Sequence, residues 1–168
     1  SLLFALLFFL PHAEAKKITV GVKPGLQYDP KLLHVQPGEQ VELIFDNVDE
    51  MMHNFVLVEP GSRMEVVEAA IALGAEGPEL QYVPKSDKVI VATPVVLPGK
   101  KATVEFMAPK KEGEYPYVCT FPGHGFLMHG VLFVSKVPPK AVQSTVEEQE
   151  GEKSAWGEFE NQGGAIVH

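Results

Sequence analysis

Apolar and polar positions alternate in short segments along most of this chain. Such alternation, or a short apolar run bounded by turn residues, is typical of β-strands that bury one face. Several segments are separated by Pro-Gly pairs, a strong turn signal. The pattern predicts eight strands, at residues 18–22, 32–35, 40–45, 54–58, 88–92, 102–106, 115–119 and 131–134. Short strands at this spacing predict an all-β fold, a Greek-key β-sandwich.

One segment departs from the strand pattern. Residues 64–73 place apolar side chains at i, i+3, i+4 and i+7, the period of an amphipathic helix. Ser62 stands where it can cap the amino end, with Glu65 three residues later, and Gly74 follows the run. The sequence therefore predicts one short helix inserted into the sandwich.

The two ends of the sequence differ from its centre. Residues 2–10 are all apolar and precede Ala13-Glu14-Ala15, as in the apolar region and cleavage site of a secretory signal peptide. We therefore expect residues 1–15 to be a signal peptide whose first residues are missing from this sequence. The mature protein is then expected to be secreted or periplasmic and to have no transmembrane span. Residues 136–168 are polar and acidic and are expected to form a tail or linker, which leaves 16–135 as the folded domain.

Composition narrows the class of protein further. The 168 residues are 45% hydrophobic and carry a net charge of −8, which suits a folded domain and argues against nucleic-acid binding, because that function needs a basic face. Cys119 is the single cysteine, so no internal disulfide can form. An exposed free thiol would be a liability in an exported protein. We therefore expect Cys119 to be buried or bound to a metal.

The most unusual cluster of side chains surrounds this cysteine. Cys119, His124 and Met128 follow one another at C-x4-H-x3-M spacing, with a Pro-Gly pair between the first two. A loop can bring their donor atoms to one point, whereas an extended strand would hold its two ends about 30 Å apart. His53 supplies a second imidazole from upstream. Two histidines, one cysteine and a weak axial methionine are the ligand set of a blue copper site.

Other functions remain open from the residues alone. A thiol nucleophile with a histidine base would leave His53 and Met128 without a role. A copper enzyme would need a second copper site with more histidines, and the chain has six. Met51 and Met52 beside His53 weakly favour copper delivery or storage. Finally, the domain could take up electrons for a larger secreted redox protein, because a polar segment follows it.

The same residues resemble the azurin and auracyanin branch of the cupredoxins. The resemblance rests on Met52-His53-Asn54-Phe55 and on Cys119-Thr120-Phe121-Pro122-Gly123-His124 followed by Met128 and Gly130. It extends over about residues 17–135, and residues 62–80 stand where azurins carry a helical flap. It implies a cupredoxin-like β-sandwich that binds one type 1 copper ion and transfers single electrons, and that is not an enzyme.

The resemblance also implies a role for individual residues. His53, Cys119 and His124 are expected to be the equatorial copper ligands, and Met128 the axial one. The backbone carbonyl of Met52 is a candidate for a further weak contact. Two side chains are expected to support the ligands, those of Asn54 and Phe121.

His124 lies on the ligand loop and is expected to turn its ring edge toward solvent, as the port for electrons. Exposed apolar patches mark interaction sites, and four residues are expected to form one here: Met51, Pro122, Phe126 and Leu127. The expected partners are redox proteins that donate and accept electrons in transient complexes, such as a cytochrome or a respiratory complex.

Overall fold

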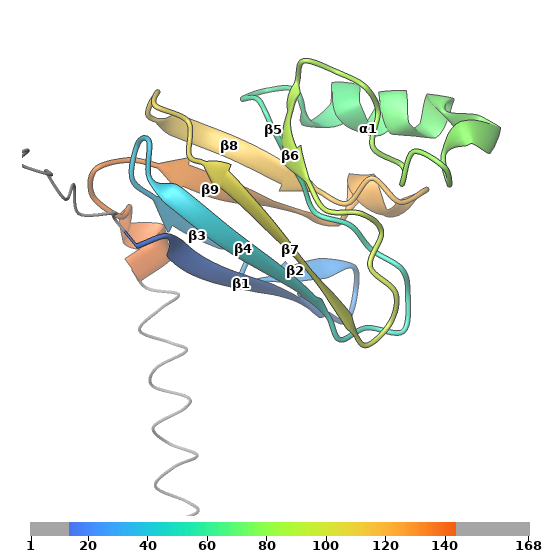
Figure 1. Cartoon of the computed structure of the whole chain (residues 1–168), viewed down its shortest axis with the longest axis horizontal. Coiled ribbons are helices and arrows are strands. Elements are labelled where there is room, and N and C mark those ends of the chain that lie inside the picture. Colours follow the sequence, from blue (N-terminus) through green and yellow to red (C-terminus); the bar gives the residue numbers. More distant parts are fainter. Residues whose placement is uncertain (1–13, 144–168) are drawn as a thin grey trace, which may run out of the picture.

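Two β-sheets face each other, and the helix α1 (Arg63–Ala72) lies outside them, alongside β5 (Val56–Val58) and β6 (Val89–Ala92) (Figure 1). The computed structural model describes residues 14–143. The predicted signal peptide, except for its last two residues, and most of the predicted tail therefore lie outside the described residues. Within the described part of the chain, no helix is long and apolar enough to cross a membrane.

The first sheet has the strand order β2-β1-β4-β7 and the second has the order β3-β9-β8-β5-β6. The strands of the first sheet are β1 (Lys16–Lys23), β2 (Gln27–Asp29), β4 (Gln40–Asn47) and β7 (Lys100–Met107). Those of the second are β3 (Leu32–Val35), β5 (Val56–Val58), β6 (Val89–Ala92), β8 (Gly113–Val118) and β9 (His129–Val134). The pairs β1–β4 and β3–β9 are parallel, and all other pairs are antiparallel.

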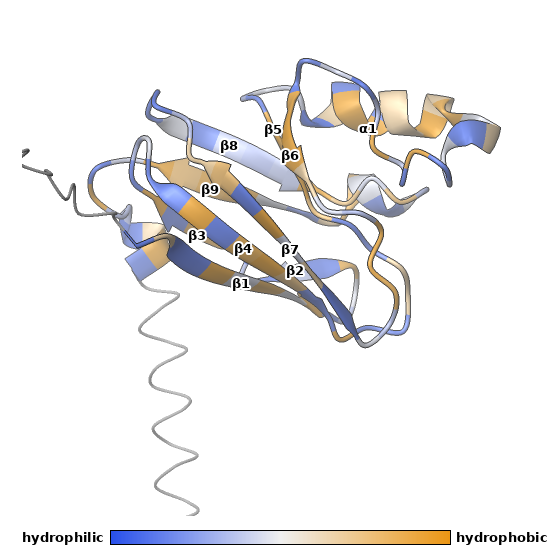
Figure 2. Ribbon diagram, viewed as in Figure 1, coloured by the Kyte–Doolittle hydropathy of each residue, from blue (hydrophilic) through white to orange (hydrophobic). Residues whose placement is uncertain are grey.

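The alternation of side chains places the core between the two sheets. Val41, Leu43 and Phe45 of β4 are buried and alternate with residues that are half-buried. This is the period of two expected of a strand with one face toward the core, and Figure 2 shows that apolar residues are frequent along β4. The first sheet therefore needs only one apolar face to pack against the second.

Aromatic side chains fill the centre of this core. The ring of Tyr28 meets the rings of Phe45, Phe55 and Tyr117 edge to face, at centroid distances of 5.9, 6.0 and 5.0 Å. Its hydroxyl donates a hydrogen bond of 2.6 Å to the backbone oxygen of Asn54. The core is thus joined directly to the segment that precedes β5.

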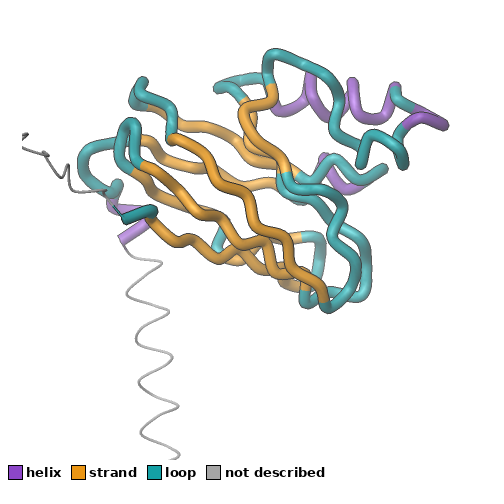
Figure 3. Tube along the Cα trace, viewed as in Figure 1, coloured by secondary structure: helices purple, strands orange, loops and turns teal. Residues whose placement is uncertain are grey.

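All eight predicted strands are present, and the structure adds β2, which makes nine among residues 14–143. The three residues of β2 are too few to show a period, so the sequence pattern does not predict this strand. Strand β5 begins at Val56 rather than at position 54, because His53 and Asn54 leave the β5–β8 ladder. Figure 3 shows that long loops connect the strands at the end where this departure occurs.

The predicted helix is also present, as α1 (Arg63–Ala72), but its predicted capping box is wrong. The Ser62 side chain makes no capping hydrogen bond, because its backbone is turn-like, with φ −93° and ψ 4°, rather than extended as a capping residue requires. The Ser62 carbonyl instead accepts a hydrogen bond from the Val66 N–H. A short 3₁₀ turn (Gly74–Glu76) follows the helix.

Candidate metal centre

Two neighbouring strands bring His53 and Cys119 together. In the antiparallel pair β5–β8, Val56 lies opposite Val118. His53, just before β5, and Cys119, just after β8, therefore emerge at the same end of the sheet. His53 is fixed there by two backbone hydrogen bonds with Val96, of 3.3 and 2.7 Å.

The loop after Cys119 returns the second histidine to this point. Gly123 has φ +82°, a left-handed conformation that glycine adopts without strain. A 3₁₀ turn, η2 (His124–Phe126), follows directly. The Cys119 N–H then donates to the Met128 carbonyl at 3.0 Å, and the Met128 N–H donates to the His124 carbonyl at 2.9 Å. These bonds close the loop into a compact turn that holds all three predicted ligands of this segment.

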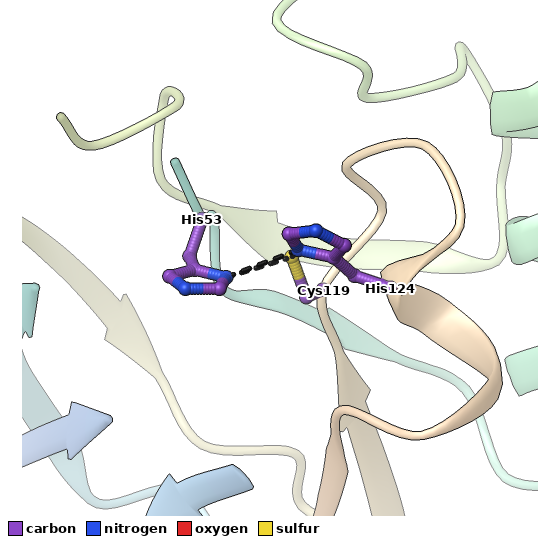
Figure 4. Close-up of side chains that lie close together, drawn as sticks. All are labelled: His53, Cys119 and His124. Atoms are coloured by element: carbon purple, nitrogen blue, oxygen red, sulfur yellow. Dashed lines mark hydrogen bonds between the residues drawn. The ribbon is translucent and has the colours of Figure 1, made fainter. Parts of the chain in front are cut away.

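The three donor atoms of His53, Cys119 and His124 converge, as Figure 4 shows. The Nδ1 atoms of the two histidines are 3.1 Å apart, and the Cys119 Sγ lies 3.9 Å from the first and 3.7 Å from the second. A metal about 2.0 Å from each nitrogen and 2.3 Å from the sulfur, in trigonal geometry, would place the pairs about 3.5 and 3.7 Å apart. The spacing therefore fits one metal ion bound by all three atoms.

Water is largely excluded from this cluster. His53, Cys119 and Met128 are fully buried, and His124 is 9% exposed. Burial and the adjacent His53 lower the pKa of His124, which favours the neutral imidazole that a metal requires. Burial raises the pKa of the Cys119 thiol to about 11, and backbone hydrogen bonds from Asn54 and Phe121 act in the opposite direction. A soft thiolate with two imidazoles in a dry site suits copper.

Asn54 links the histidine segment to the cysteine loop. Its Nδ2 donates to Thr120 Oγ1 at 2.9 Å, and its Oδ1 accepts from the Thr120 N–H at 2.8 Å. A further bond runs from Nδ2 to the Gln81 carbonyl at 3.1 Å. Asn54 is fully buried, so these bonds are shielded from water. Asn54 therefore joins the segment that carries His53 to the loop that begins at Cys119.

Phe121 lies beside His124, and the predicted docking residues are at the protein surface. The Phe121 ring is half-buried, with its centroid 5.0 Å from the His124 ring and 5.1 Å from that of Tyr82. The expected patch residues are all exposed, namely Met51, Pro122, Phe126 and Leu127. Met52 is exposed as well, and its carbonyl contact with a metal stays a prediction.

Two residues in contact with the site were missed from the sequence. The Oδ2 atom of Asp49 lies 2.9 Å from the Nε2 atom of His53, and this hydrogen bond lowers the pKa of the Asp49 carboxyl. Arg63, at the start of α1, donates from Nη1 to the Gly125 carbonyl at 2.9 Å. Neither stands in a motif: Asp49 lies in an irregular turn, and the Arg63 contact spans 62 positions.

Comparison with known proteins places this site in a family. The sequence model of the family described as copper binding proteins, plastocyanin/azurin family, matches residues 15–135. The chain belongs to this family. This cupredoxin is 36% identical over 121 residues to auracyanin-A of Chloroflexus aurantiacus, across 70% of this chain and 74% of the relative. It is 34% identical over 122 residues to azurin-1 of Alcaligenes xylosoxydans xylosoxydans, across 71% and 85%.

Solved structures agree with the sequence relatives. The blue copper protein auracyanin A of Chloroflexus aurantiacus superposes with a TM-score of 0.67 at 31% identity, over 73% of this chain and all of that one. Reduced auracyanin from Roseiflexus castenholzii gives 0.63 at 30%, over 72% and 98%. The predicted azurin and auracyanin resemblance, the β-sandwich fold and copper as the cofactor are therefore confirmed. Cupredoxins as a family carry electrons rather than catalyse reactions.

Proposed function

We propose that this cupredoxin carries single electrons between redox proteins outside the cytoplasm. The observation that supports this most directly is the convergence of the His53, Cys119 and His124 donor atoms in a nearly dry site. We assign these three residues as equatorial copper ligands, Met128 as the axial ligand and the Met52 carbonyl as a further weak contact. Copper, when bound, supplies the one-electron Cu(II)/Cu(I) couple.

The residues of the chain keep the site in one geometry for both oxidation states. Backbone hydrogen bonds between Cys119, Met128 and His124 close the ligand loop. Asn54 ties that loop to the His53 segment. Because both segments are fixed by the fold, little rearrangement accompanies electron transfer. Exclusion of water has the same effect, since few solvent dipoles next to the ligands need to reorient.

Electrons enter and leave through the exposed part of His124, with the apolar patch around it as the docking surface. Phe126 and Leu127 are 54% and 63% exposed, on the same loop as the histidine. A small apolar surface suits short-lived complexes, which bury less area than stable ones. The partners are a donor and an acceptor protein, each of which exchanges one electron per encounter, such as a cytochrome or a respiratory complex. We assign residues 16–135 to the copper domain and 1–15 to the export signal.

The first test is spectroscopic. The protein loaded with Cu(II) should show the intense red-light absorption of a thiolate–copper bond, and Cys119→Ser should abolish it. His34→Ala is the matched control, because His34 bonds to the Ser135 carbonyl at 2.8 Å and takes no part in the cluster. A copper-loaded wild-type protein without that absorption would refute the assignment of Cys119.

The second test distinguishes an electron carrier from a copper delivery protein. The exposed methionines Met51 and Met52 weakly favour copper delivery. Voltammetry of the loaded protein should give a reversible one-electron wave, with copper retained after many cycles. Release of the ion on reduction, with transfer to a Cu(I) chelator, would instead identify a delivery protein.

A further inference from the structure

Asp49 occupies the side of His53 that faces away from the metal site. The Nδ1 atom of His53 points toward Cys119 and His124, whereas its Nε2 atom lies 2.9 Å from Asp49 Oδ2. A metal needs the lone pair on Nδ1, so the ring proton must be on Nε2. The carboxylate is the acceptor for that proton.

The position of Asp49 is itself fixed by hydrogen bonds. Its second oxygen, Oδ1, accepts from the Glu50 N–H at 2.8 Å, and its own N–H donates to Asn47 Oδ1 at 3.1 Å. Asn47 is fully buried and donates from Nδ2 to the carbonyls of Met51 and Val96, at 2.7 and 2.8 Å. Val96 in turn pairs with the His53 backbone. One carboxylate oxygen is thereby held and the other is aimed at the imidazole.

We propose that Asp49 is a positioning residue of the copper centre, which fixes the His53 tautomer and favours the oxidised state of the metal through its negative charge. The inference rests on the proposed copper site and adds a determinant of its reduction potential. A histidine ligand whose second nitrogen donates to a carboxylate is oriented and made more basic. Asp49 acts through His53 and does not touch the metal.

The sign of the electrostatic effect follows from the charges. The oxidised centre carries one more positive charge than the reduced one, so a nearby carboxylate stabilises it more. In the described structure the Asp49 carboxylate is hydrogen-bonded to His53 and makes no ion pair with a lysine or arginine that would neutralise it. Glu50, which is exposed, carries a second negative charge in the same turn. Removing the Asp49 charge should therefore raise the reduction potential.

The decisive variant is Asp49→Asn, which keeps the size of the side chain and an acceptor oxygen. We expect the ratio of Cu(II) to Cu(I) affinity to fall about tenfold, which is a rise of about 59 mV for a one-electron couple. Asp49→Glu should leave the reduction potential close to the wild-type value, because it retains the charge. Glu50→Gln is the matched control: it removes the same charge one residue away and should change the potential much less.

A second measurement needs no copper. Nitrogen NMR of the metal-free protein should show His53 with its proton on Nε2, and Asp49→Ala should give a mixture of the two neutral tautomers. If the wild-type protein already shows the mixture, the positioning role is wrong.

The outcomes distinguish this inference from the proposed function. If wild-type protein is blue but Asp49→Asn leaves the potential unchanged, or Glu50→Gln shifts it equally, the role of Asp49 fails and the copper site stands. If wild-type protein is not blue, the proposed function fails. The tautomer of His53 in the metal-free protein then still supports or overturns the positioning by Asp49.

Discussion

Asn54 shows how a single side chain can support a metal centre without binding the metal. It adjoins His53 in the sequence and bonds to Thr120, which adjoins Cys119. The two ligand segments are thus joined by side-chain–to–loop bonds that do not depend on an ion. Because these groups are buried, a lost partner leaves a polar group without water to replace it, and this costs more than the bond itself contributes.

We therefore expect Asn54→Ala to lower the free energy of unfolding of the metal-free protein by about 3 kcal/mol, since the Thr120 N–H loses its acceptor. Denaturant unfolding at neutral pH would measure this. Thr120→Val is the graded comparison. It removes the Oγ1 acceptor but keeps the N–H bond, and Asn54 Nδ2 still reaches the Gln81 carbonyl, so its cost should be about 1 kcal/mol. Equal effects of the two variants would contradict the assigned network.

At the scale of elements, α1 is packed against the ligand loop. Val66 and Val67 of the helix join Val118 of β8 in a small apolar cluster. Arg63 bonds to the Gly125 carbonyl, and the Val67 side chain covers the Gly125 Cα so closely that a Cβ there would lie 2.6 Å from Val67 Cγ2. The helix thus limits the movement of the turn that carries His124.

Gly125→Ala tests this contact. The added methyl would also lie 2.9 Å from the Cys119 carbonyl oxygen, so the loop must shift away from the helix. We expect a loss of about 1–3 kcal/mol in stability, as for other overpacked sites, together with faster loss of copper to a chelator. Gly113→Ala in β8 is the control, because its Cβ would lie 3.6 Å from the nearest atom, an ordinary contact. An equally mild effect at both positions would show that the loop does not depend on α1.

The elements differ in how far the sequence predicts them. The alternation in β4 and the helical period of α1 are local signals, and both elements form where they indicate. The C-x4-H-x3-M spacing likewise identifies donors that must share one loop. Asp49 and Arg63 act across irregular or distant connections, and no local pattern encodes which atoms such side chains meet. Their contacts follow only from the tertiary structure.

At the scale of the whole molecule, three of the tyrosines that the structure describes are buried in the core between the sheets, and Tyr28 and Tyr117 are the two most deeply buried. Tyr28 donates to the Asn54 carbonyl at 2.6 Å and Tyr117 to the Pro30 carbonyl at 2.8 Å, so each is satisfied as the neutral, protonated form. Burial raises the pKa of both hydroxyls well above the ordinary value, and the neighbouring Cys119 adds to the shift at Tyr28. The fold therefore opposes ionisation of these hydroxyls. As a consequence, the free energy of unfolding depends on pH in the alkaline range.

The sign of that dependence gives a final prediction. An unfolded tyrosine loses its proton near pH 10, whereas Tyr28 in the fold keeps it, so the stability is complete below about pH 10 and falls as the pH rises toward the folded value. Each such phenol should lower the free energy of unfolding by about 1.4 kcal/mol per pH unit in this range. Tyr28→Phe removes one of them. Its unfolding free energy should be lower at neutral pH, through loss of the bond to Asn54, but should fall less steeply above about pH 11 by that amount. Denaturant titrations of the metal-free wild type and variant at several alkaline pH values would measure both slopes, and parallel slopes would mean that Tyr28 ionises in the folded protein.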